Sequence, residues 1–231
     1  MAKKRTSHSK LINPKARPLD QRSEANNALL ISYLGLRKAI GIVAIALPFF
    51  LGLGTVIFDA GLPISISAAY YTNTRNILVG GMCAIGAFLM SYHGYERKDG
   101  IAAKVAAICS FGAALFPTAP ELNATVRESI IGGFHAFFTV VSFMTIAFFS
   151  LFLFRKTDPT KKPTPQKLRR NQIYLACGIT NVVSILLIGV FWLFPANAAI
   201  NQLKPIFWLD ALGMLSFGLA WLTKGEAILK D

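Results

Sequence analysis

The chain has 231 residues, of which 54% are hydrophobic and only 15% are charged, and its formal net charge is +13. Its mean hydropathy is +0.50, whereas a typical soluble domain is about 45–50% apolar and carries charge along its whole length. Here the charged residues occur in blocks between apolar runs of about 20 residues, the length of a helix that crosses a bilayer. The composition therefore excludes an ordinary soluble domain and predicts an all-α integral membrane protein with one helical domain.

Residues 1–38 form a polar arm that carries nine Lys and Arg against two acidic residues. We expect roughly the first 22 residues to be disordered, because they are polar and because Pro14 and Pro18 interrupt helix formation. From Ser23 the sequence predicts a helix, either a short one lying in the membrane interface or an extension of the first span. A cleavable signal peptide is not predicted, since the first apolar run begins only near Ala39.

Six apolar segments follow the arm, and each is predicted to be a transmembrane helix of a single domain over residues 39–223. Pro48 lies within the first segment and predicts a kink there. The third segment is short and rich in Ala, which suits a helix buried among the others. The cysteines lie in apolar segments without paired spacing and are expected to be small core residues: Cys83, Cys109 and Cys177. The predicted spans, which precede a short tail over 224–231, are about 39–58, 75–92, 101–116, 129–154, 172–194 and 206–223.

Lysine and arginine are distributed unequally between the two sides of the predicted bundle. Twenty of the 24 lie in the arm, the loops after the second and fourth spans, and the tail, whereas the opposite loops carry only Arg75, Arg127 and Lys204. By the positive-inside rule, this pattern predicts six transmembrane helices with both termini cytoplasmic. The basic side is expected to contact membrane lipids with anionic headgroups. Nucleic acid is not an expected partner, because no aromatic residue interleaves with the basic arm.

Ionisable residues at one predicted depth, the outer half of the membrane, form the main candidate site. Such residues are costly inside a bilayer, usually face the bundle interior and often mark a functional site. Polar and aromatic residues of the loop after the first span adjoin them. The candidate polar cavity comprises Asp59, Tyr70, Tyr71, Asn73, Arg75, His135 and Asp210.

Three interpretations of this candidate site stay open at the level of sequence. Arg75 can pair with Asp59 or Asp210 while His135 bonds to a backbone carbonyl, which is a purely structural arrangement. Alternatively, His135 and Asp210 act as titrating groups in a polar binding cavity. A zinc site would need three ligands and an open position, which His135, Asp210 and Asp59 can supply. The sequence disfavours metal because it has no HxxxH or HExxH pair, so we expect no metal and no other cofactor.

A second polar cluster follows the second span on the predicted inner face. His93, Glu96 and Asp99 are groups that can perform acid–base chemistry. The same residues also suit a tight polar turn between two helices, and charged residues are common at a membrane interface. The sequence favours the turn.

Three segments resemble parts of a group of small bacterial inner-membrane proteins, similar to six-helix families classed as domains of unknown function. They are YYTNTRNILVGGMCAIG (Tyr70–Gly86), SYHGYERKD (Ser91–Asp99) and ALFPT (Ala114–Thr118). The resemblance implies a multi-pass protein of the bacterial inner (cytoplasmic) membrane and no particular activity. Ceramidase-like and adiponectin-receptor-like membrane hydrolases hold their metal with several His residues, including an HxxxH pair in a late helix. The late spans here contain no His, which argues against that family.

The sequence favours a binding or sensing role over an enzyme. In this hypothesis the polar cavity takes a lipid, a small solute or a partner helix. The alternative is a membrane-embedded enzyme acting on lipid or isoprenoid substrates through His135 and Asp210. A third hypothesis is a small transporter acting as an oligomer, and a homo-oligomer is compatible with all three.

Overall fold

The structure of the chain is a computed structural model that describes residues 17–59, 61–94, 96–157, 160, 162–194 and 198–229. All regular elements in these ranges are helices. The predicted disorder of residues 1–16 lies outside the described residues. The elements are α1 (Arg17–Phe58), η1 (Ser67–Tyr71), α2 (Arg75–Met90), α3 (Arg97–Leu115), α4 (Val126–Phe148), the π-helical η2 (Phe149–Leu153), α5 (Pro165–Leu193), α6 (Ala198–Gln202) and α7 (Pro205–Lys224).

The predicted membrane character is confirmed in its general form. Four helices are long and apolar enough to cross a membrane: Asn26–Phe58, Val126–Leu153, Pro165–Leu193 and Pro205–Lys224. The two remaining predicted spans also coincide with helices. Of these, α2 is apolar but has only 16 residues, which gives it a length of about 24 Å, shorter than the hydrocarbon core of a typical bilayer.

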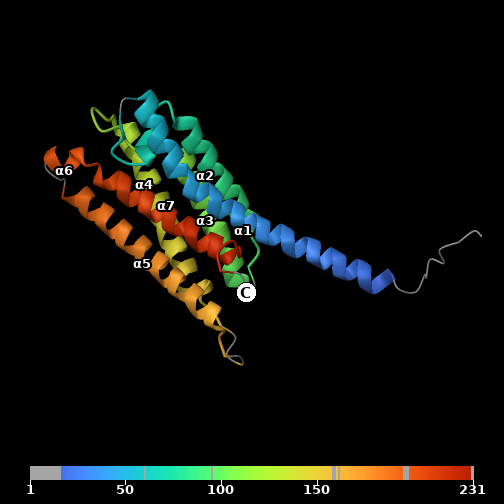
Figure 1. Cartoon of the computed structure of the whole chain (residues 1–231). Coiled ribbons are helices and arrows are strands. Elements are labelled where there is room, and N and C mark those ends of the chain that lie inside the picture. The colour runs from blue at the N-terminus through green and yellow to red at the C-terminus, as the bar shows by residue number, and fades with distance from the viewer. Residues whose placement is uncertain are drawn as a thin grey trace, which may run out of the picture.

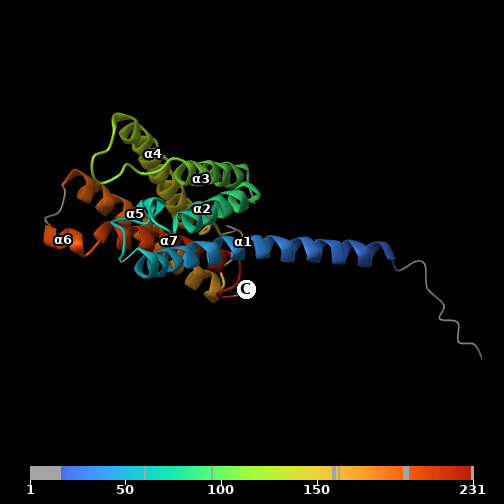
Figure 2. The same ribbon diagram turned by 90° about the horizontal axis from the view of Figure 1, so that it is seen from above.

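Six helices form a closed ring in which each packs against two neighbours. The order around this six-helix ring is α1, α2, α3, α4, α5 and α7, and α7 returns to α1. Figures 1 and 2 show the helices side by side, with the N-terminal part of α1 projecting beyond the others. Consecutive helices are thus spatial neighbours, and contacts of α7 with both α1 and α5 close the ring. Several helices surround the interior of the ring, so a site there must be assembled from residues of more than one helix.

The contact that closes the ring depends on two glycines. A Cβ atom at Gly218 of α7 would lie 2.7 Å from the carbonyl oxygen of Gly41 in α1, and one at Gly41 would lie 2.8 Å from the carbonyl oxygen of Gly218. Any larger side chain at either position therefore meets backbone. Small residues at such crossings let transmembrane helices approach closely.

The segment before the first predicted span continues that span as part of α1. This helix has 42 residues, about 63 Å of length, roughly twice the thickness of a bilayer core. Residues 17–22, where the sequence favours disorder, form its beginning. Pro18 is tolerated there because a helix has no internal hydrogen bond to lose in its first turn. Of the two alternatives left open after Ser23, the structure has the extension of the span.

An aromatic cluster fills the end of the ring where α2 ends and α3 begins. Trp221 of α7 is fully buried, with its ring centroid 4.9 Å from that of Tyr92, 5.6 Å from Phe149 and 5.3 Å from Phe154. The π-helical turn of η2 brings Phe149 and Leu153 into this core. The cluster closes this end of the ring interior with large, tightly packed side chains.

Candidate functional site

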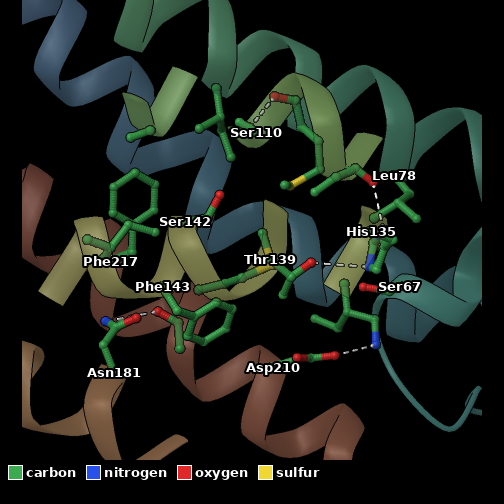
Figure 3. A pocket seen from close by; sticks show the side chains of 18 of the residues that line it. Ser67, Leu78, Ser110, His135, Thr139, Ser142, Phe143, Asn181, Asp210 and Phe217 are labelled. Carbon is green, nitrogen blue, oxygen red and sulfur yellow. Dashed lines mark hydrogen bonds between the residues drawn. The ribbon is translucent and has the colours of Figure 1, made fainter. Parts of the chain in front are cut away.

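The ring interior contains a cavity of about 90 Å³ lined by residues of five α-helices, by Ser67 of η1 and by Ile66 just before it. Much of its wall is apolar, with Met82 of α2, Phe143 of α4 and Met214 of α7 among the lining residues. Polar side chains interrupt this wall, and several of them are shown in Figure 3. The polar residues that line this central cavity are Ser67, Ser110, His135, Thr139, Ser142, Asn181 and Asp210.

His135 is buried and both of its ring nitrogens have partners. Its Nδ1 lies 2.8 Å from the carbonyl oxygen of Phe116 and 3.1 Å from that of Ala113. Carbonyl oxygens only accept hydrogen bonds, so Nδ1 carries the proton. Nε2 of the neutral ring then accepts a hydrogen bond from the Thr139 hydroxyl at 3.2 Å (Figure 3). The arrangement matches the structural alternative, in which His135 bonds to a backbone carbonyl.

Asp210 connects α7 to the segment that begins η1. Its Oδ2 accepts a hydrogen bond from the backbone N–H of Ile66 at 3.1 Å (Figure 3). It is 8% exposed and, among the described residues, is the one acid that lines the central cavity. Burying a carboxyl group is costly unless hydrogen bonds or an opposite charge compensate. The site therefore has a single, strongly desolvated acid at one wall.

Asn181 of α5 is a cavity residue that sequence reasoning missed. Its Nδ2 donates to Ser216 Oγ at 2.5 Å and to the carbonyl oxygen of Cys177 at 3.2 Å. Its Oδ1 and the hydroxyl of Ser142 are buried and have no hydrogen-bond partner in the described part of the chain. An unsatisfied buried polar group costs about 1–3 kcal/mol, so two of them in one cavity wall require an explanation. The signal that could have indicated it is an uncharged amide in the middle of an apolar span.

The other five predicted site residues belong to the loop outside the cavity. Asn73 donates to Asp59 Oδ1 from its backbone N–H at 3.1 Å and from its side-chain amide at 2.7 Å. The Arg75 guanidinium lies 4.0 Å from the ring centroid of Tyr70 and donates a hydrogen bond to its hydroxyl. The Tyr71 hydroxyl donates to the carbonyl oxygen of Thr118 at 2.6 Å. None of the five lines the central cavity.

Two of the arrangements weighed for these residues do not occur. Within the described ranges, Arg75 forms no ion pair with Asp59 or Asp210, because it lies against Tyr70 of η1. The three suggested zinc ligands do not come together, since no three His, Cys, Asp or Glu side chains gather among the described residues. Asp59 instead holds the loop through Asn73, while His135 and Asp210 remain at the cavity.

The second polar cluster of the sequence analysis contains a helix cap and an ion pair. Glu96 and Asp99 form a reciprocal capping box at the start of α3, and Glu96 accepts from Lys156 Nζ at 2.8 Å, with Asp99 Oδ1 3.6 Å from the same nitrogen. The hydrogen bond with Glu96 raises the pKa of Lys156. His93 Nδ1 lies 3.0 Å from the carbonyl oxygen of Ser91. These contacts therefore stabilise the polar turn between α2 and α3.

No family model, no curated protein and no solved structure matches this chain. What the site can do therefore follows from its geometry. The central cavity offers an apolar wall, one acid, one neutral imidazole and two polar atoms that lack partners, which is a composition typical of small-molecule sites.

Proposed function

We propose that the protein spans the membrane six times, with both termini in the cytoplasm, and binds a small molecule in the central cavity. Each predicted span coincides with a helix, and the loops on one side carry most of the Lys and Arg. In a ring of six helices, the short α2 is supported by α1 and α3 on either side. A short helix in such a bundle is accommodated by local thinning of the bilayer at modest cost.

Reporter fusions test the topology. Alkaline phosphatase, which is active only outside the cytoplasm, is fused after Asp231 in one variant and after Leu122 in another. The proposal predicts an active enzyme at Leu122 and an inactive one at Asp231. The reverse pattern, or activity at both positions, contradicts six spans with cytoplasmic termini.

The observation that carries the binding role is the pair of unpartnered polar atoms, Asn181 Oδ1 and Ser142 Oγ, in the cavity wall. A molecule in the cavity that donates a hydrogen bond to Asn181 Oδ1 removes the cost of burying that oxygen without a partner. A volume of about 90 Å³ admits a few water molecules or a small polar group. The occupant is therefore a small solute, or the terminal group of a larger molecule, with at least one hydrogen-bond donor.

Asp210 further restricts the charge of the occupant. It is acidic, while the buried His135 ring holds its proton on Nδ1 against two carbonyl oxygens, and none of the described residues that line the cavity is Lys or Arg. An anion would lack any attractive charge in this wall and would face a carboxyl group. The cavity accordingly favours a neutral or cationic donor over an anion.

Three probes of similar size and different charge test this role: ethanolamine as a cation, glycerol as a neutral molecule and acetate as an anion. The thermal unfolding midpoint of the purified protein is measured with each. Ethanolamine or glycerol should raise the midpoint and acetate should not. Ser142→Ala should weaken the effect, whereas the control Thr145→Val, which removes a hydroxyl bonded within α4 to the carbonyl oxygen of Val141, should not. Stabilisation by acetate alone, or equal responses of both variants, would contradict the proposal.

One observation favours an enzyme as the second candidate. The Thr139 hydroxyl, the His135 ring and the two carbonyl oxygens behind that ring form a chain in the order nucleophile, base and orienting group. The same contact is also ordinary for residues four apart in a helix. Covalent labelling of Thr139 by a fluorophosphonate, lost in Thr139→Val, would support catalysis, and absence of labelling in the folded protein would argue against a hydroxyl nucleophile.

A further inference from the structure

A second hollow lies among the loops at the end of the ring opposite to the aromatic cluster. Its volume is about 570 Å³, which is within the usual range of small-molecule sites. Three parts of the chain form it: the loop between α1 and α2, the loop between α3 and α4, and the residue that precedes α7. We call this hollow the loop groove, and its wall includes Asp59, Leu62, Tyr71, Glu121, Leu122 and Lys204.

Hydrogen bonds hold the walls of the loop groove in place. The Tyr71 hydroxyl donates to the carbonyl oxygen of Thr118 at 2.6 Å, which joins the first loop to the second. Asp59 Oδ1 accepts two hydrogen bonds from Asn73, so the carboxyl group is fixed just after the end of α1. The backbone N–H of Lys204 donates to the carbonyl oxygen of Asn201 at 3.0 Å, directly before α7 begins. The groove is therefore formed by the protein itself, before any ligand binds.

The loop groove contains charged groups of both signs that do not pair with each other. Asp59 and Glu121 are acids, and Lys204 is a base. Among the described residues, Lys204 forms an ion pair with neither acid. Asp59 Oδ2 is buried without a hydrogen-bond partner in the same ranges, while Lys204 is half-buried and Glu121 is exposed. Carboxylate oxygens and an ammonium group thus share one groove without satisfying each other.

We propose that the loop groove binds a small zwitterion, namely an α-amino acid with an apolar side chain. A ligand with a single charge would attract one side of the groove and be repelled by the other. In a zwitterion, the ammonium group faces the two acids and the carboxylate faces Lys204, and such charge-assisted hydrogen bonds are stronger than neutral ones. Leu122 in the same wall is 81% exposed, and it offers apolar surface to the side chain of the ligand.

The position of the loop groove favours a dissolved amino acid over a lipid headgroup. The described residues of its wall lie in loops or in η1, beyond the ends of the long apolar helices. The groove is also separate from the central cavity, because the loop after α1 presents Ile66 and Ser67 to the cavity and Tyr71 to the groove. Binding in the groove therefore does not depend on the function proposed for the cavity.

The test uses leucine and two analogues that each lack one of its charges. Leucinamide keeps the ammonium group, and isocaproate keeps the carboxylate. The thermal unfolding midpoint of the full-length protein in neutral detergent is measured with each, in slightly acidic buffer that keeps leucinamide protonated. Lys204→Gln removes the base of the groove, and the control Arg127→Gln removes an exposed basic residue of α4 outside it. Glu121→Gln changes an exposed side chain, so the test stays valid if Lys204→Gln does not fold.

Leucine should stabilise the wild type and Arg127→Gln at the same concentration. Each analogue, or leucine with Lys204→Gln, should need about tenfold more, as expected when one hydrogen bond to a charged group is lost. Lys204→Gln should also respond equally to leucine and leucinamide, and Glu121→Gln should narrow the difference between leucine and isocaproate. Ser142→Ala, which alters the central cavity, should leave the leucine response unchanged.

Three results would overturn the proposal. The first is the absence of stabilisation by leucine. The second is an equal response of the wild type to leucine and both analogues, or an equal leucine response of Lys204→Gln and Arg127→Gln. The third is stabilisation by phosphatidylethanolamine and not by leucine, which would assign the groove to a lipid headgroup with the same two charges.

Discussion

The two ends of the six-helix ring bury polar groups in different ways. Around the central cavity, His135 and Asp210 are each fixed by backbone groups, and the cavity wall is neutral apart from one acid. At the other end, Arg37 and Arg170 are both buried, and the Arg37 guanidinium lies 4.2 Å from the ring centroid of Tyr33. The comparison teaches that one ring can bury polar groups in two ways, by hydrogen bonds to the backbone at the cavity and by packing basic side chains beside aromatic rings at the other end.

Closure of the ring should matter most, because the central cavity is assembled from residues of five of its helices. Gly218→Ala places a Cβ atom 2.7 Å from the carbonyl oxygen of Gly41, and such overpacking costs about 1–3 kcal/mol. Gly189→Ala is the matched control, since a Cβ atom there meets nothing within 4 Å, and it should be neutral or stabilising by up to about 1 kcal/mol. Thermal unfolding in detergent measures both. Equal midpoints for the two variants would show that the contact between α1 and α7 does not hold the ring together.

The acid of the cavity should behave as a hydrogen-bond acceptor for the backbone. Asp210→Leu leaves the N–H of Ile66 without its partner, which should destabilise the fold by about 1–3 kcal/mol. Asp210→Asn keeps an acceptor oxygen and should retain most of the stability while weakening the response to ethanolamine more than the response to glycerol. Equal destabilisation by both substitutions would contradict the hydrogen bond, and an unchanged ethanolamine response in Asp210→Asn would contradict the role of its charge.

Arg75 should contribute to the loop and not to the cavity. Arg75→Ala removes its contact with the Tyr70 ring, a loss of about 0.5–1 kcal/mol for an exposed cation–π pair. The response to glycerol should be the same as in wild type. A lost ligand response in a stable Arg75→Ala variant would place this residue back in the site, as the sequence had predicted.

The ion pair of Lys156 with Glu96 should have the smallest effect. Both side chains are exposed, at 41% and 56%, and exposed ion pairs contribute about 0–1 kcal/mol. The pKa of Lys156 is raised by its hydrogen bond with Glu96, so the contribution is complete below the ordinary lysine pKa and is lost as pH rises through the raised value. Lys156→Met should therefore lower the unfolding midpoint slightly at pH 7 to 9, with the difference from wild type shrinking only above about pH 10.5. A difference that shrinks already below pH 9 would contradict this assignment.

The helices were predictable because the length and polarity of each apolar segment are local properties of the sequence. The joint position of His135 and Asp210 was also predictable from depth, since both are predicted near the outer end of a span. The partners of Asp59 and Arg75 were not predictable, because they depend on how the loop folds. In the structure, Asp59 contacts Asn73 and Arg75 contacts Tyr70.

Two features needed the closed ring to become visible. Asn181 is an uncharged residue of an apolar span, and only packing decides whether such a residue faces lipid, a neighbouring helix or a cavity. Arg37 donates a hydrogen bond to the carbonyl oxygen of Lys224, 187 residues away, and this contact forms only because α7 returns to α1. The positive-inside pattern predicts that Arg37 and Lys224 lie on the same side but not that they meet.

The most direct test of the central claim is an experimental density map of the protein in nanodiscs, at a resolution that shows ordered small molecules. We predict density for a non-protein molecule within hydrogen-bonding distance of Asn181 Oδ1 and Ser142 Oγ, with Asp210 bonded to the N–H of Ile66. A ring interior filled by protein side chains, in which Asn181 and Ser142 bond to each other or to neighbouring helices, would contradict a binding cavity.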